Sequence, residues 1–229
     1  MTIRIISSMA TRALLADLRQ AWQAAHPEAP FEVESVGGVD AAKRIAAGEA
    51  FDGVVLASDA IDKLMAGGHV LAGSRVDLVH SGVAVAVREG APRPDIGSEG
   101  ALRQALVAAR SLGYSTGPSG TQLLKLFERW GLMAELQGKL VQAPAGVPVG
   151  RLVAEGQVEL GFQQLSELMS LPGITVVGPL PTAVQITTTF SGSVAAASRQ
   201  AGAVQALLAW MASPGTDAIK QHHGMEPAR

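Results

Sequence analysis

Short apolar segments alternate with stretches of helical periodicity along most of the chain, and this alternation restricts the possible folds more than any other feature. Ile3–Ile6 has the composition of a buried strand. Leu14, Leu18 and Trp22 then share one helical face. A repeated strand–loop–helix unit is typical of a mostly parallel sheet covered by helices, so we expect an α/β fold. The further segments that we expect to be strands are Phe31–Val36, Gly53–Ala57, Gly82–Val87, Ser111–Tyr114, Leu140–Gln142, Leu160–Phe162, Ile174–Val177, Gln185–Phe190 and Ser193–Ala197.

Composition excludes several classes of protein. With 229 residues, 48% hydrophobic and 17% charged, the chain can bury a large core and is not intrinsically disordered. A net charge of −2 offers no basic field for a nucleic acid, so we expect no such partner. The absence of cysteine excludes disulfides, iron–sulfur clusters and cysteine nucleophiles.

No segment of the sequence approaches the ~20 apolar residues of a membrane span, so we expect no membrane insertion. The N-terminus runs directly into a strand-like segment and lacks the features of a secretory signal. As given, the sequence therefore favours the cytoplasm. The alternative is a periplasmic protein whose signal peptide was trimmed.

Two crossing segments, near Val79–Gly82 and Ala183–Phe190, interrupt the strand–helix alternation. They are compatible with one continuous sheet. They are equally compatible with two lobes, in which a middle segment is inserted into a first lobe that the C-terminus completes. The pattern alone leaves both arrangements open.

Small polar residues and glycines follow the predicted strands, at the places where helices begin. In α/β sheets ligands bind beyond the carboxyl ends of strands, where free backbone N–H groups and the helix dipole favour anions. Each such residue alone is as typical of a helix cap or a turn. Together, with Ser81 at a crossing, they predict an anion site. The ligand-binding candidates are Ser7, Ser8, Arg12, Gly37, Gly38, Ser58, Ser81, Ser115, Ser119, Gly120, Gln163 and Gln164.

Candidates for acid–base chemistry are few. His80 lies at a crossing segment, and Glu167 follows Gln164 by three residues, so either could serve as a base, although a packed histidine and a solvated glutamate are the ordinary alternatives. The five histidines show no metal-ligand spacing, and we expect no metal. No lysine follows the glycines as in a phosphate loop, and we expect no cofactor.

Several short motifs carry a family resemblance over nearly the whole chain. They are Ser8-Met9 with Leu14-Leu15, Arg44–Glu49 before the strand that ends at Ala57-Ser58-Asp59, Pro118-Ser119-Gly120, Val153–Gly156 leading to Gly161-Phe162, Gly178–Pro181 and Gly224. The chain thereby resembles the molybdate-binding components of ABC transporters.

The resemblance implies the two-lobed type II periplasmic-binding-protein fold, with a mostly parallel sheet flanked by helices in each lobe. Lobe 1 would comprise residues 1–80 and 190–229, lobe 2 residues 81–189, with the ligand cleft between them. Within that cleft, Ser8 would supply a hydroxyl and Ser119 a backbone N–H. A permease of an ABC transporter is the implied partner, and a monomer is the expected state.

Two departures from the family pattern change the expected ligand. Gly38-Val39 stands where the family has a serine pair, and Gln164 where it has a tyrosine. Because donors that enclose a tetrahedral dianion are lost, we expect an organic carboxylate rather than molybdate. The runs Val85–Pro92 and Gly161–Glu167 resemble a divergent branch that includes aconitate isomerase. Binding of a small anion is therefore our main prediction, and a cytosolic isomerase of an unsaturated di- or tricarboxylate is the alternative.

Overall fold

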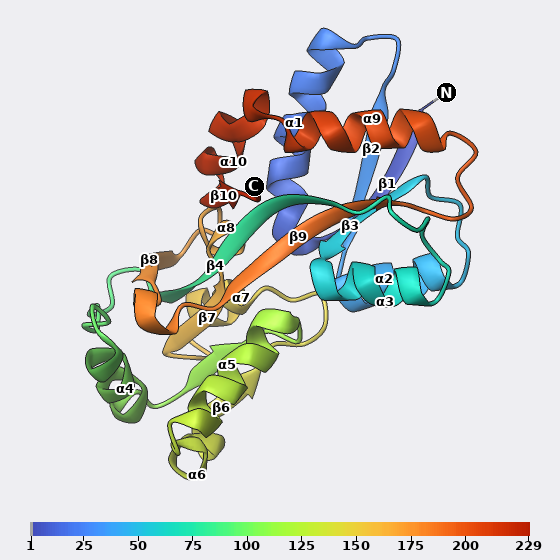
Figure 1. Cartoon of the computed structure of the whole chain (residues 1–229). Helices are drawn as coiled ribbons and strands as arrows, with labels where there is room; N and C mark the ends of the chain where they lie inside the picture. Colours follow the sequence, from blue (N-terminus) through green and yellow to red (C-terminus); the bar gives the residue numbers. More distant parts are fainter. Residues whose placement is uncertain (1) are drawn as a thin grey trace. The chain divides into compact units, whose positions relative to one another are not determined.

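Strands followed by helices recur along the chain, as the alternating apolar segments predict (Figure 1). The structure is a computed structural model that describes residues 2–229. It divides into two units, of which the first runs to Ser81 and resumes at Thr189, and the second is Gly82–Thr188. Both boundaries lie inside strands, β4 (Val76–Arg88) and β9 (Thr187–Val194). The expected crossing segment Val79–Gly82 thus lies within β4, whereas Ala183–Phe190 begins in a short helical turn and continues into β9.

The first unit holds, besides parts of β4 and β9, the elements nearest the two ends of the chain. Strand β1 pairs in parallel with β2 and β3, whereas β9 is antiparallel to β3, and β10 is antiparallel to β4. The elements are β1 (Ile3–Ser8), η1 (Met9–Thr11), α1 (Arg12–Ala25), β2 (Phe31–Val36), α2 (Gly38–Ala46), β3 (Gly53–Ala57), α3 (Ser58–Ala66), α9 (Ala201–Ala212), η4 (Pro214–Thr216), α10 (Asp217–His222) and β10 (Met225–Pro227).

Alternation along the central strands buries both faces of this sheet. Ile5 and Val55 pack with residues of α1 and α9, whereas Ile6 and Val54 pack with residues of α2 and α3. In Figure 1, α2 and α3 lie side by side along one face of the strands. Strands buried on both faces explain the continuous apolar runs in the sequence.

The second unit repeats this plan around the other part of β4. Strand β5 pairs in parallel with β6 and β7, and β4 is antiparallel to both β7 and β8. The α/β fold is confirmed. In each unit, the parallel strands are joined by antiparallel pairing to one of the long strands, β9 in the first unit and β4 in the second. The elements are α4 (Glu99–Ala108), β5 (Leu112–Tyr114), α5 (Pro118–Arg129), α6 (Met133–Leu136), η2 (Gln137–Lys139), β6 (Leu140–Gln142), α7 (Val149–Ala154), β7 (Leu160–Gln164), α8 (Leu165–Leu168), β8 (Ile174–Pro179) and η3 (Thr182–Val184).

The prediction of two separate strands at Gln185–Phe190 and Ser193–Ala197 is wrong, because β9 runs through the intervening residues. Gly192 lies within this strand. A Cβ there would lie 2.3 Å from Cδ2 of Leu208 on α9, so the glycine permits close packing rather than a turn. Within residues 2–229, no helix has both the length and the apolar character of a membrane span.

Candidate functional site

In the first unit, three parallel strands end at one edge of the sheet, and each is followed directly by a helical segment. Ser8 is level with Val36 at the ends of β1 and β2, and α2 and α3 begin at Gly38 and Ser58. Gly37 is the residue before α2. The candidates Ser7, Ser8, Gly37, Gly38 and Ser58 therefore share this edge, which we call the first-unit edge.

Ser8 is the candidate at the first-unit edge whose hydroxyl is left free for a ligand. Its residue is 7% exposed, and its Oγ is buried without a hydrogen-bond partner among the described residues. Gly38 lies against it, because a Cβ on Gly38 would be 3.6 Å from the Cβ of Ser8. A buried hydroxyl without a partner costs about 1–3 kcal/mol, a cost that a bound acceptor would offset.

Two other candidates of the first unit have different surroundings. The Oγ of Ser7 lies 2.8 Å from the Oγ of Ser35 on β2, so this hydroxyl joins two neighbouring strands. Arg12 is exposed and lines a hollow of about 440 Å³ with Arg19 and Ser35, between α1 and β2. Neither residue has the unpartnered buried donor found at Ser8.

The candidates at the crossing segment lie on β4. Nδ1 of His80 is 3.0 Å from Oγ1 of Thr189. Ser81 is fully buried, and among the described residues its Oγ has no hydrogen-bond partner. Ser81 thus resembles Ser8, whereas His80 already has a polar neighbour.

In the second unit, the parallel strands β5 and β7 end beside each other, and α5 and α8 follow them. The Oγ atoms of Ser115 and Ser119 lie 3.1 Å apart, across the loop that enters α5. Ser119 and Gly120 are buried in the first turn of this helix. We call this region, with Gln163, Gln164 and Glu167, the second-unit edge.

Replacing Gly120 by alanine should destabilise the protein. A Cβ on Gly120 would lie 1.9 Å from the carbonyl oxygen of Ser115, which is a backbone atom that cannot rotate away. Overpacking of this kind costs about 1–3 kcal/mol, or a decrease of roughly 2–12 °C in Tm for a chain of this size. Thermal unfolding measures it. Gly138→Ala is the control, since its Cβ would meet nothing within 4 Å, and an equal loss in both variants would contradict the prediction.

The amide of Gln164, the last residue of β7, has one free atom. Its Nε2 donates to Thr188 Oγ1 at 2.8 Å, and its Oε1 is buried without a partner among the described residues. The Thr188 hydroxyl can donate as well as accept, so the amide can turn over and leave its NH₂ group free instead. Gln164 can therefore offer a ligand either an acceptor or two N–H donors.

Glu167 and Gln163 form a hydrogen-bonded pair at the second-unit edge. Nε2 of Gln163 donates to Glu167 Oε2 at 2.7 Å, and the backbone N–H of Gly150 donates to Gln163 Oε1 at 3.3 Å. Burial raises the pKa of Glu167 from 4.5 to about 7, and the hydrogen bond from Gln163 opposes this rise. A carboxyl group with such a pKa can accept and return a proton near neutral pH.

Thr188 and Gly150 were missed by the sequence reasoning. Thr188 lies in a threonine-rich strand with no distinguishing motif, and Gly150 contributes only its backbone N–H. Neither carries a signal in the sequence. Among residues 2–229, no group of three or more histidine, aspartate or glutamate side chains is placed to hold a metal ion.

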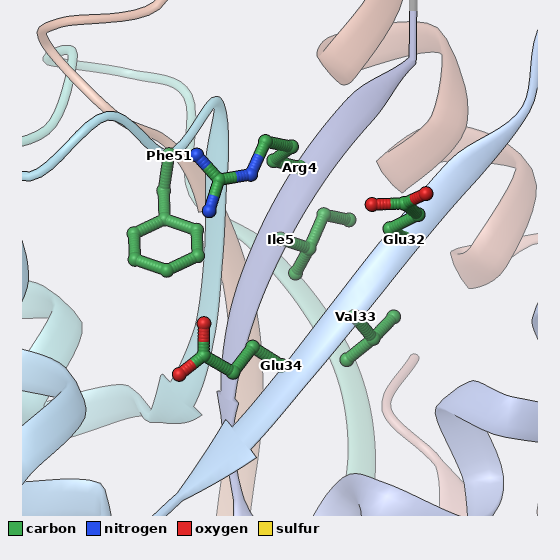
Figure 2. Close-up of a pocket in the computed structure, with 6 residues that line it drawn as sticks. All are labelled: Arg4, Ile5, Glu32, Val33, Glu34 and Phe51. Atoms are coloured by element: carbon green, nitrogen blue, oxygen red, sulfur yellow. The ribbon is translucent and has the colours of Figure 1, made fainter.

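A second hollow, of about 90 Å³, lies on the first unit away from the strand ends (Figure 2). The guanidinium carbon of Arg4 is 4.9 Å from the centre of the Phe51 ring, and the carboxylate of Glu34 forms an ion pair with Arg44. None of the predicted site residues lines this hollow. It contributes to the surface of the sheet rather than to the candidate site.

Comparison with known proteins identifies the family. The model of the family described as "Bacterial extracellular solute-binding protein" matches residues 3–226. The chain belongs to this family. This solute-binding-protein family member is 43% identical over 185 residues to a curated protein named aconitate isomerase, from Pseudomonas sp. That match covers 80% of the present chain and 70% of the relative.

Solved structures support the solute-binding-protein fold. The periplasmic molybdate-binding protein of Azotobacter vinelandii matches with a TM-score of 0.81 and 18% identity, covering 99% of this chain and 100% of that one. The substrate-binding domain of a molybdenum ABC transporter from Clostridium difficile matches with a TM-score of 0.78 and 16% identity, covering 100% and 99%. At these identities the likeness concerns the fold alone.

Proposed function

We propose that this protein binds an unsaturated organic polycarboxylate and isomerises it by moving one proton between two carbon atoms. The observation that carries the proposal is the half-buried carboxyl of Glu167, which accepts a hydrogen bond from Gln163 at 2.7 Å and whose pKa desolvation raises to about 7. Glu167 lies in α8, which follows directly on Gln164, the last residue of β7. A proton acceptor and an amide able to hold a carboxylate therefore occur within one short stretch of the chain, at the second-unit edge.

The chemistry of the proposed step is balanced without a co-reactant. In a substrate of the aconitate type, ionised Glu167 takes a proton from the CH₂ carbon beside the double bond. The electron pair of that C–H bond spreads over the allylic system and an adjacent carboxylate, where N–H and O–H donors stabilise it. Glu167 then returns the proton to the far alkene carbon, and the double bond moves by one position.

The ligand chemistry is supported by the free polar atoms at the two edges. Ser8 and Gln164 each have a buried polar atom without a partner among the described residues, and both lie at strand ends that precede helical segments. Such places favour negative charge. The relative named aconitate isomerase supports a tricarboxylate as the anion.

Incubation of the protein with cis- or trans-aconitate in heavy water tests the proposed function. We expect deuterium on the allylic carbon and interconversion of the isomers, both read by NMR. Thermal shift against molybdate, tungstate, sulfate, citrate and the two aconitates identifies the ligand, since a ligand at ~100 times its Kd stabilises by about 2.7 kcal/mol. Absence of exchange over hours would contradict the isomerase proposal for this substrate, and a shift with molybdate alone would contradict the carboxylate.

A second candidate function is binding without chemistry, in which the protein delivers an anion to an ABC transporter permease. The family description, extracellular solute-binding protein, favours it. Under this candidate the protein lies outside the cytoplasmic membrane, whereas the isomerase is compatible with the cytoplasm. Fractionation of the native cells distinguishes the two locations, and a thermal shift with aconitate but no deuterium exchange would favour binding alone.

Replacing Ser8 by alanine is expected to weaken anion binding about 10- to 150-fold, because a hydrogen bond to a charged group contributes about 1.5–3 kcal/mol. Calorimetric titration with the anion found by thermal shift measures the change. Ser74→Ala is the matched control: it also removes a buried hydroxyl of the first unit, but one that donates to Leu71 O at 2.7 Å. Equal affinity losses in both variants would indicate a general structural effect and contradict the role of Ser8.

A further inference from the structure

Gln163 differs from its neighbour Gln164 in that the orientation of its amide is fixed. The backbone N–H of Gly150 can only donate, and it lies 3.3 Å from Gln163 Oε1. That atom must therefore be the oxygen. The NH₂ group is then directed to Glu167 Oε2 at 2.7 Å. Gln164 contacts a hydroxyl, which permits both orientations, so only Gln163 is fixed in this way.

Both polar ends of Gln163 are thus used within the protein. The residue is 3% exposed, and its partners come from two different helices, α7 and α8. The oxygen and one N–H of this amide are thereby engaged, and the role of Gln163 as a ligand donor stays a prediction. Gln163 is suited to hold the Glu167 carboxylate in one place and to favour its ionised form.

We propose that Gln163 is a positioning residue, which transmits the fixed direction of the Gly150 N–H to the carboxylate of Glu167 and holds that carboxylate ready to accept a proton. This inference rests on the proposed isomerase function. The inference adds to the proposed function, because it assigns the control of the base, Glu167, to a residue that need not itself contact the substrate.

The surroundings of Glu167 leave Gln163 as its main polar influence. Strands β7 and β8 pack on α8 and carry no titratable side chain. Leu168 of α8 also packs with Ala84 and Ala86 of β4, and the titratable residue of that part of β4 is Arg88. Glu167 is the only titratable residue of α8 itself. Arg151 on α7 is bound to Glu155 at a distance of 2.7 Å. Burial alone favours the protonated carboxyl, and a hydrogen bond to the carboxylate favours the ionised one.

The test replaces Gln163 by methionine, which is similar in length and lacks an N–H. Without the donor, the pKa of Glu167 should rise by about one unit, read by ¹³C NMR titration of the carboxyl in protein without substrate. In the isomerase assay, the acidic limb of the plot of kcat/KM against pH should move to higher pH by the same amount. Activity at pH 7 should fall about 5-fold, because the ionised fraction of Glu167 drops from about one half to about one tenth, and it should largely recover at pH 9.

A matched control exists in the same unit. Gln157 donates to Glu155 Oε2, also at 2.7 Å, but Glu155 is part of an exposed ion pair. Gln157→Met should leave the limb unchanged. If Gln163→Met does not fold, Gln163→Glu keeps the size and the acceptor for Gly150 and should also raise the pKa of Glu167.

The outcomes separate this inference from the proposed function. A raised pKa of Glu167 together with a shifted limb supports the positioning role. A loss of activity that is uniform across pH, or an unchanged pKa, would overturn it even if the wild-type protein is an isomerase. If the pKa of Glu167 rises in Gln163→Met but the wild-type protein has no isomerase activity, the contact between Gln163 and Glu167 is supported and its role in catalysis is overturned. That result would also show that the proposed function is wrong.

Discussion

Glu167→Gln should abolish deuterium exchange and isomerisation while anion binding persists. Glutamine has nearly the same shape as glutamate and can still contact Gln163, but it cannot accept a proton from carbon. Loss of a general base lowers the rate about 100- to 10,000-fold. NMR detection of exchange in heavy water, with calorimetric titration of the same sample, measures both properties.

The control for this substitution is Glu135→Gln, which changes an exposed glutamate in the first turn of the short helix α6. It should leave the exchange rate unchanged. If Glu167→Gln retained the wild-type exchange rate, another base would be at work. His80, at 3.0 Å from Thr189, would then be the candidate to replace next.

The same variant should also change how stability depends on pH. Because burial raises the pKa of Glu167 from 4.5 to about 7, the folded protein holds this proton more tightly than the unfolded chain. The free energy of unfolding therefore falls as pH rises from about 4.5 to about 7, and glutamine removes that fall. Glu167→Gln should melt at a higher temperature than the wild-type protein above pH 7, which also shows that it is folded.

The positions of the strands could be predicted from local patterns, and parallel pairing brings their ends to one edge. Both β1 and β7 run two residues beyond the predicted ends at Ile6 and Phe162, so that Ser8 and Gln164 are the last residues of their strands. Ser8 and Gln164 followed from this reasoning, although their role in binding stays a prediction. Strand alternation also explains why Ser7 and Ser8 cannot serve the same purpose, since successive side chains point to opposite faces and Ser7 meets Ser35.

The partners of these residues could not be predicted, because they come from distant parts of the chain. Gly150 reaches Gln163 through the packing of α7 on β7, and Thr188 reaches Gln164 from a strand 24 residues away. The direction in which the Arg12 side chain points depends on how α1 packs on the sheet. The sequence gave only the number of residues between Ser8 and Arg12. Whether an amide is free or engaged is decided by such packing rather than by local sequence.

Gln164→Glu should nearly eliminate anion binding, an effect larger than that of removing the side chain's donors. The new carboxylate keeps the shape of the amide and can still accept from the Thr188 hydroxyl. It places a negative charge where a ligand carboxylate needs an N–H donor. Loss of the donor alone costs about 1.5–3 kcal/mol, and repulsion between two poorly solvated carboxylates adds to it.

Two further variants separate repulsion from the loss of donors. Gln164→Met removes the N–H groups without adding charge and should weaken binding about 10- to 150-fold, less than Gln164→Glu does. Gln142→Glu makes the same change of charge at the end of β6, which is separated from β7 by β5 in the same sheet, and there the side chain is exposed, so the affinity should be almost unaltered. Calorimetric titration at low and high salt distinguishes the three, because salt screens the exposed charge far more than a buried one. If Gln164→Glu bound the anion as tightly as Gln142→Glu, the amide would not contact the ligand, and the second-unit edge would lose its proposed carboxylate donor.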